Sequence, residues 1–249
     1  MEGLDLGLDL GAARIRPLEE AFYVADFITE EEEDYLLRKI TSAPIPAWKT
    51  LSHRRLQTYP SSLTNNNTLL ASPLPKWLTT PIISRFDALS LFGDAPHKRP
   101  NHVLVNEYRP GQGIMPHEDG AAYYPLVATI SLGGVVVLDL YGKGRGNVNT
   151  GSGGGDGGDR GPKYRILQER RSLLVTRGAV YRDYLHGIAE RERDEGLCPD
   201  SICNWDLLRE PERYAGGWCM RETRISLTYR DVLRVAKVGN TMKFLNMNR

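Results

Sequence analysis

A histidine and an aspartate stand two residues apart in this chain, at His117 and Asp119, and a further histidine follows at His186. Side chains two residues apart on a strand point to the same face, so one imidazole and one carboxylate can reach a single metal ion. His-x-Asp taken alone is more often two polar residues on the wet face of a strand. With His186 as a third ligand, we expect a metal site.

Two histidines and one carboxylate leave several coordination positions of the metal open, a pattern typical of non-haem Fe(II) sites that bind both a cosubstrate and O₂. A strand predicted at Thr223–Arg230 carries groups that suit such a cosubstrate. Its even positions include Arg224, Ser226 and Arg230, whereas its odd positions are apolar. Guanidinium groups donate paired hydrogen bonds to carboxylates, which the dicarboxylate 2-oxoglutarate would need.

The stretch from residue 106 to residue 119 must position several of these groups. It reads as two short strands joined by a tight turn at Arg-Pro-Gly-Gln-Gly, where the chain reverses. Asn106 and Tyr108 share one face before the turn, as His117 and Asp119 do after it. We expect both pairs to point into whatever the strands enclose, with Asn106 and Tyr108 adding hydrogen bonds to the cosubstrate.

Many short strands, few helices and glycine-rich turns predict a mainly β fold with flanking helices (α+β). Its core would be a double-stranded β-helix, or jelly roll, whose interior can enclose a ligand. Helices are expected at 30–41, where a capping box begins at Thr29 and Tyr35, Leu36, Leu37 and Ile40 face a core, and at 75–92, interrupted near Pro81. A loop is expected at 61–72 and a turn at Arg177-Gly178.

We expect one domain over residues 21–236, with a poorly ordered N-terminus at 1–20 and a C-terminal tail at 237–249. Two insertions interrupt it. Residues 142–161 are half glycine and too polar to form a core, and residues 190–217 are charged and contain Pro and Gly.

The order of the motifs is specific: Asn-x-Tyr, His-x-Asp, a distal His and Arg-x-Ser-x-x-x-Arg on the last strand. In this order they resemble the AlkB family of Fe(II)/2-oxoglutarate dioxygenases, most closely the branch known as the sixth animal AlkB homologue. The resemblance implies Fe(II) held by His117, Asp119 and His186, with 2-oxoglutarate and O₂ as cosubstrates. It also implies that Arg224 pairs with the distal carboxylate of 2-oxoglutarate, and that the rest of its site is formed by Asn106, Tyr108, Ser226 and Arg230. No catalytic residue is expected beyond the metal ligands.

The resemblance further implies oxidative demethylation of an alkylated DNA or RNA base, taken from a single strand or flipped out of a duplex. Candidate contacts to nucleic acid are Arg54, Arg55, Tyr59, Tyr123, Tyr124, Arg165, Arg170 and Arg171. The basic, aromatic stretch 53–59 is equally well explained as a solvated strand or loop. Two other functions remain open: a protein side-chain hydroxylase or demethylase with the same iron site, and a nucleic-acid-binding module with little turnover.

The composition is that of an ordinary globular protein, with 249 residues, 41% hydrophobic residues, 25% charged residues and a net charge of +1. This balance gives no global attraction to nucleic acid or membrane, so any basic surface must be local. Neither a signal peptide nor a membrane span is expected, and we expect an intracellular protein of the nucleus and cytoplasm, favoured as a monomer. Three clustered cysteines, Cys198, Cys203 and Cys219, suit reduced thiols better than disulfides, with a zinc site as the less favoured alternative.

Overall fold

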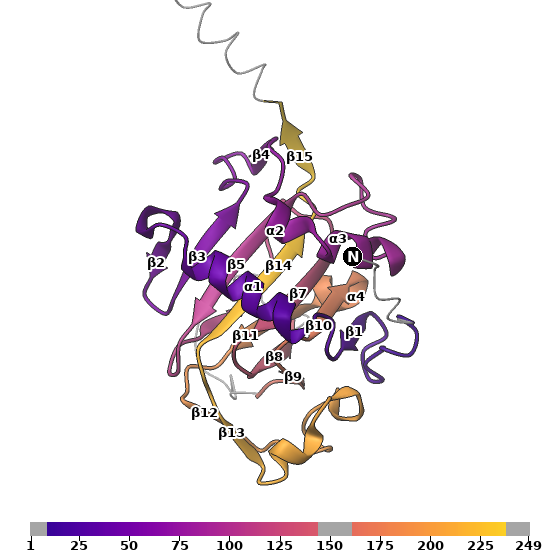
Figure 1. Cartoon of the computed structure of the whole chain (residues 1–249). Coiled ribbons are helices and arrows are strands. Elements are labelled where there is room, and N and C mark those ends of the chain that lie inside the picture. Colours follow the sequence, from indigo (N-terminus) through magenta and orange to yellow (C-terminus); the bar gives the residue numbers. More distant parts are fainter. Residues whose placement is uncertain (1–8, 144–160, 238–249) are drawn as a thin grey trace, which may run out of the picture.

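The structure is a computed structural model that describes residues 9–143 and 161–237. Two antiparallel β-sheets face each other, and helices cover the outer face of the larger one (Figure 1). The larger sheet has seven strands in the order β1 (Ala21–Val24), β10 (Leu173–Arg177), β7 (Leu126–Leu132), β14 (Arg224–Arg230), β5 (His102–Tyr108), β3 (Arg54–Tyr59) and β2 (Lys49–Leu51).

The smaller sheet has four strands, and two short pairs complete the β structure. Its order is β6 (Ile114–His117), β11 (Tyr184–Ile188), β8 (Val136–Gly142) and β9 (Tyr164–Gln168). The short pairs are β12 (Arg193–Glu195) with β13 (Trp218–Met220), and β4 (Thr68–Leu70) with β15 (Arg234–Ala236). The helices are α1 (Glu30–Thr41), α2 (Lys76–Thr79), α3 (Ile82–Ala88) and α4 (Gly178–Asp183), with 3-10 turns at η1 (Ile45–Ala47), η2 (Trp205–Leu207) and η3 (Pro211–Tyr214).

Helix α1 begins where the sequence predicts it. The Thr29 hydroxyl accepts a hydrogen bond from the Glu32 backbone N–H, and the Glu32 carboxylate accepts one from the Thr29 backbone N–H, which completes a capping box. Leu36 and Ile40 are buried against the sheet, but Tyr35 is exposed, contrary to expectation. The buried face of α1 is therefore narrower than predicted, because it does not include Tyr35.

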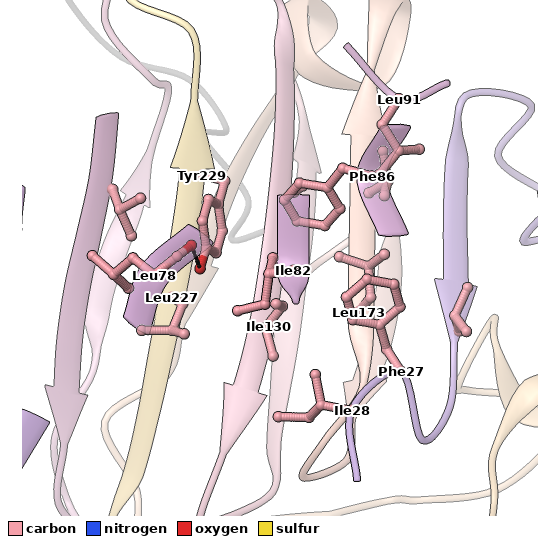
Figure 2. Packing of buried hydrophobic residues seen from close by; sticks show 14 of the residues in the cluster. Phe27, Ile28, Leu78, Ile82, Phe86, Leu91, Ile130, Leu173, Leu227 and Tyr229 are labelled. Carbon is pink, nitrogen blue, oxygen red and sulfur yellow. Dashed lines mark hydrogen bonds between the residues drawn. The ribbon is translucent and has the colours of Figure 1, made fainter. Parts of the chain in front are cut away.

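The main hydrophobic core lies between helices α1 to α3 and the larger sheet (Figure 2). Phe86 of α3 lies at its centre, with its ring centroid 5.1 Å from that of Tyr229, 5.7 Å from Phe27 and 5.9 Å from Phe92. The Tyr229 hydroxyl donates to the Leu78 carbonyl of α2 at 2.9 Å, so this buried phenol keeps a partner. The helices are thereby tied to the central strand of the sheet.

Strand β14 shows the predicted period of two. Ile225, Leu227 and Tyr229 join the core under the helices, whereas the even positions face the smaller sheet. All seven residues of this strand are buried. Polar residues on a strand that is covered on both faces need hydrogen-bond partners, because burying an unpaired polar group is unfavourable. For β14 such partners are to be found in the space between the two sheets.

The turn after Tyr108 differs from the prediction in what it connects. Strands β5 and β6 do not pair with each other, because β5 lies in the larger sheet and β6 in the smaller one. The turn, with Gly111 at φ +82°, carries the chain from one sheet to the other. Gly133, at φ +78°, makes the same kind of crossing between β7 and β8. Asp119 lies just after β6 and not within a strand.

Other local predictions need correction. Residues 9–20 are not poorly ordered, since Ile15 and Leu18 are buried in a second core cluster. The expected loop 61–72 contains strand β4, which the distant β15 holds by parallel pairing. The expected turn at Arg177-Gly178 begins helix α4. Each of these three features depends on contacts with residues that are far away in the sequence.

The insertions and the tail are described only in part. Most of the glycine-rich insertion and of the tail, residues 144–160 and 238–249, lies outside the described residues. Residues 190–217 contain β12 and two 3-10 turns, and Arg221 holds this segment through a buried ion pair with Asp194 at 2.7 Å. The three cysteines are unpaired. Among the described residues, no helix is both long and apolar enough to cross a membrane.

Replacing Phe86 by Ala should lower the free energy of unfolding by about 3–5 kcal/mol, because the change leaves a cavity beneath three aromatic rings. Urea denaturation measures this loss. Tyr35→Ala, a deletion at an exposed position, should change the same quantity by less than about 1 kcal/mol. A loss below about 1 kcal/mol for Phe86→Ala would contradict the central position given to this ring.

Candidate active site

A cavity of about 230 Å³ lies between the two sheets. All eight residues that the sequence singled out for the metal and cosubstrate sites line it: Asn106, Tyr108, His117, Asp119, His186, Arg224, Ser226 and Arg230. They come from both sheets and from the segment after β6. The fold therefore gathers in one place residues that are up to 124 positions apart in the sequence (230 − 106).

The two histidines form a cross-strand pair on the smaller sheet. His117 of β6 is directly opposite His186 of β11, with ring centroids 4.3 Å apart. Nδ1 of His117 lies 2.9 Å from the Met115 carbonyl oxygen. An N–H at this position donates to that carbonyl, which orients the ring and leaves Nε2 free to bind a metal.

Asp119 completes a cluster suited to a metal ion. One ligand atom from each of His117, Asp119 and His186 lies within 4.8 Å of the other two, and this is the one such group among the described residues. Burial lowers the pKa of His186 to about 4, so its imidazole is neutral at pH 7, the form that binds metals. The donor set, two neutral nitrogens and a carboxylate, fits Fe(II).

Arg230 holds the Asp119 carboxylate in place. Its Nη2 donates to Oδ1 of Asp119 at 2.5 Å and its Nε donates to Oδ2 at 3.2 Å, with both side chains mostly buried. The Arg230 guanidinium also lies 5.0 Å from the Tyr123 ring centroid. This paired contact fixes the plane of the carboxylate and so orients it toward the histidines.

Arg224 occupies the other end of the same row on β14. Its Nη2 donates to Ser131 Oγ at 2.8 Å and to Gln168 Oε1 at 3.1 Å, and its buried Nε has no partner among the described residues. No described carboxylate forms an ion pair with it. Burial lowers the pKa of Arg224 to about 10, which still leaves it charged at pH 7. A buried cation without a counter-charge is unfavourable, so this end of the cavity suits an anion.

The remaining cosubstrate candidates lie between these arginines. Ser226 pairs with Asn106 across β14 and β5, as Arg224 does with Tyr108. Arg54 of β3 donates from Nε to Asn106 Oδ1 at 3.3 Å and also lines the cavity. The polar side chains thus continue from one arginine to the other.

The eight residues predicted to contact nucleic acid lie in different surroundings. Arg54 and Tyr123 line the cavity. Four others are held in ion pairs: Arg55 with Glu107, Arg165 with Asp139, Arg170 with Glu33 and Arg171 with Asp26. Tyr59 donates to Gln57 Oε1, and Tyr124 packs against the main core. Of the eight, Arg54 and Tyr123 are the two that the cavity itself supports.

Several polar residues of the cavity region were not predicted from the sequence, among them Ser131, Gln168 and Tyr181. Ser131 and Gln168 contact Arg224, and Tyr181 of α4 lines the cavity. Ser131 could have been found, since it interrupts the apolar strand Leu126–Leu132. Gln168 and Tyr181 carry no comparable signal, because sheet pairing and the short helix α4 place them.

Comparisons with known proteins agree with this geometry. Residues 61–230 match the model of the 2OG-Fe(II) oxygenase superfamily. The chain is 37% identical over 219 residues to the "Probable RNA/DNA demethylase ALKBH6" of Danio rerio, covering 88% of each chain. It is 29% identical over 175 residues to the tRNA (carboxymethyluridine(34)-5-O)-methyltransferase alkbh8 of Xenopus tropicalis, covering 69% of this chain and 25% of that protein.

A solved structure of similar shape, OsALKBH1, has a TM-score of 0.51 at 16% identity and covers 85% of this chain and 98% of its own. At that identity the likeness concerns the fold alone. It confirms the predicted jelly-roll core with flanking helices.

Gly187 lets β11 approach β6 closely enough for the two histidines to meet. A Cβ at this position would lie 3.0 Å from Pro116 N and 3.1 Å from the Ile114 carbonyl oxygen. Gly187→Ala should therefore push His186 away from His117 and weaken Fe(II) binding about tenfold without removing a ligand. Anaerobic titration with Fe(II) measures this. Gly142→Ala, where an added Cβ meets nothing within 4 Å, is the control, and equal affinities for the two variants would refute this role of Gly187.

Proposed function

This chain belongs to the 2OG-Fe(II) oxygenase superfamily and, within it, to the AlkB homologues, and from this premise we propose that it removes alkyl groups from nucleic acid bases. It is an enzyme, a dioxygenase whose family uses Fe(II), 2-oxoglutarate and O₂. The substrate proposal is supported by the curated relative of Danio rerio, whose name describes an RNA/DNA demethylase. The residue roles below are proposals as well.

His117, Asp119 and His186 would hold the iron. The support is their mutual reach, the neutral state of His186 and the carbonyl that orients His117. Arg230 fixes the plane of the Asp119 carboxylate, so the three proposed ligands would reach the ion together and would leave further positions for a cosubstrate and O₂.

The observation that carries the cosubstrate assignment is the buried guanidinium of Arg224, which has no carboxylate partner among the described residues. One carboxylate of 2-oxoglutarate would supply the missing charge there. Asn106, Tyr108, Ser226 and Arg230 would line the rest of its site. Ser131 and Gln168 hold the guanidinium in place with neutral oxygens, so they orient Arg224 without neutralising it.

Bound Fe(II) and 2-oxoglutarate supply the oxidation of a C–H bond by O₂, which on an N-methyl group gives the free amine and formaldehyde. The task of the protein is to place the methyl group near the three ligands and to exclude bulk water. Apolar side chains from both sheets and from α4 line the cavity for this purpose, among them Leu138, Leu174 and Val180. No side chain is required as a general base.

The base would enter from a single strand or after flipping from a duplex, since a methyl group inside a stack is out of reach of an enclosed cavity. Arg54 and Tyr123 are the proposed contacts to the nucleotide. We also propose a single catalytic domain over residues 21–236, acting as a monomer in the nucleus and cytoplasm, where nucleic acid substrates occur. The two alternative functions are a protein side-chain hydroxylase or demethylase and a nucleic-acid-binding module with little turnover. The experiments below distinguish them from the proposed function.

The cosubstrate assignment can be tested without any substrate. Anaerobic addition of 2-oxoglutarate to the Fe(II) protein should produce a visible charge-transfer band, and His117→Ala should abolish it. Arg224→Gln should still bind iron but require at least about tenfold more 2-oxoglutarate, because a charged hydrogen bond is lost. Arg99→Gln, an exposed ion-pairing arginine, is the matched control. A wild-type response in Arg224→Gln would remove Arg224 from the site.

The substrate proposal is tested with methylated single-stranded oligonucleotides. The wild-type enzyme should release formaldehyde, and binding should weaken as salt rises, because contacts to phosphates displace counterions. If the band forms but neither DNA nor RNA oligonucleotides yield formaldehyde, the nucleic acid proposal fails. Turnover of a protein substrate would then favour the hydroxylase. Salt-dependent binding without a band would favour the binding module.

A further inference from the structure

Tyr181 presents a buried hydroxyl to the cavity and leaves it without a partner. The residue lies on α4, five positions before His186, and lines the cavity together with the three metal-site residues. Its hydroxyl oxygen is buried and has no hydrogen-bond partner among the described residues. A buried hydroxyl that makes no hydrogen bond is unfavourable, so this group suits a ligand that can satisfy it.

Asp119, a carboxylate that lines the same cavity, is not the partner of this hydroxyl. Its two oxygens accept hydrogen bonds from Arg230, and the Tyr181 hydroxyl makes no hydrogen bond to either of them. Burial raises the pKa of Tyr181, and the negative charge of Asp119 raises it further. The phenol therefore keeps its proton, and it can donate to an acceptor on a molecule in the cavity.

Tyr184, three residues further along the chain, is a tyrosine of the cavity whose hydroxyl does have a hydrogen-bond partner. It also lines the cavity, and its hydroxyl accepts a hydrogen bond from Lys163 Nζ at 3.2 Å. The two tyrosines thus differ in that the Tyr184 hydroxyl has a hydrogen-bond partner, whereas the buried Tyr181 hydroxyl has none among the described residues.

We infer that the Tyr181 hydroxyl donates to a carbonyl oxygen adjacent to the methylated ring nitrogen of the target base, an inference that rests on the proposed function. The methyl group must lie at the proposed metal ligands, and Tyr181 lines the same cavity of about 230 Å³ as His117, Asp119 and His186. An acceptor that reaches Tyr181 is therefore close to the methyl group. In 3-methylcytosine such a carbonyl stands beside the methylated nitrogen. In 1-methyladenine the neighbours are a C–H and an amino group, and neither is an acceptor.

The test compares oligonucleotides that differ only in the methylated base, 3-methylcytosine or 1-methyladenine, by formaldehyde release. In the wild type, kcat/KM should be higher for 3-methylcytosine. Tyr181→Phe keeps the ring and should lower the ratio of the two kcat/KM values about tenfold, as expected when an acceptor loses its donor. Tyr35→Phe, at an exposed position outside the cavity, is the control and should leave the ratio unchanged. The charge-transfer band with 2-oxoglutarate reports that each variant retains its metal site.

The outcomes separate this inference from the function on which it rests. A wild-type enzyme with the band but no formaldehyde from either oligonucleotide overturns the nucleic acid proposal, and the inference with it. Turnover with an unchanged ratio in Tyr181→Phe overturns the inference alone. So does activity on 1-methyladenine alone. If 3-methylcytosine is the one base turned over, the tenfold loss is expected in its own kcat/KM.

Discussion

The positive charge that is buried on β14 constrains the rest of the cavity, because each buried guanidinium needs a counter-charge or hydrogen-bond acceptors. Arg230 is balanced by the Asp119 carboxylate, whereas within the part of the chain that the structure describes Arg224 contacts the neutral oxygens of Ser131 and Gln168 and no carboxylate. Burying a guanidinium without a counter-charge costs several kcal/mol, even when its hydrogen bonds are partly satisfied. This end of the cavity therefore suits an anionic ligand, as the proposed cosubstrate would be.

The same strand couples the cavity to the core. Tyr229 packs against Phe86 beneath the helices, and its neighbour Arg230 faces the metal ligands. Because alternate residues of one strand serve the two purposes, the position of each guanidinium is fixed by the packing of the aromatic residues on the other face. The helical layer, far from the chemistry, therefore determines how precisely the cavity is shaped.

Much of the site could be predicted because its signals are local. The capping box at Thr29, the period of two in β14 and the two-residue spacing of His117 and Asp119 each depend on a few neighbouring residues. Short spacing in sequence keeps two side chains close together even where the strand ends before the second of them, as β6 does before Asp119. These local motifs also occur along the chain in the order that is typical of the AlkB family, and this order carried the resemblance.

The errors came from features that depend on distant partners. The turn after Tyr108 could not be assigned to two sheets from its own residues, because the pairing of β5 with β14 and β3 decides the matter. Strand β4 exists through its parallel pairing with β15. Tyr181 sits on a six-residue helix with no side-chain cap, so nothing in the local sequence indicated where its hydroxyl would point.

The place of β6 at the edge of its sheet has a consequence for how a metal would come and go. Edge strands fray at lower free energy than interior ones, and β6 is paired on one side only, whereas β11 is hydrogen-bonded on both. Pro116 has no backbone N–H and β6 is short, and both features fit an edge that does not recruit another strand. Local opening of β6 would move His117 away, while His186 stayed in the interior strand and Arg230 of β14 still held Asp119. If these residues hold the ion as proposed, His117 would be the ligand through which it enters and leaves.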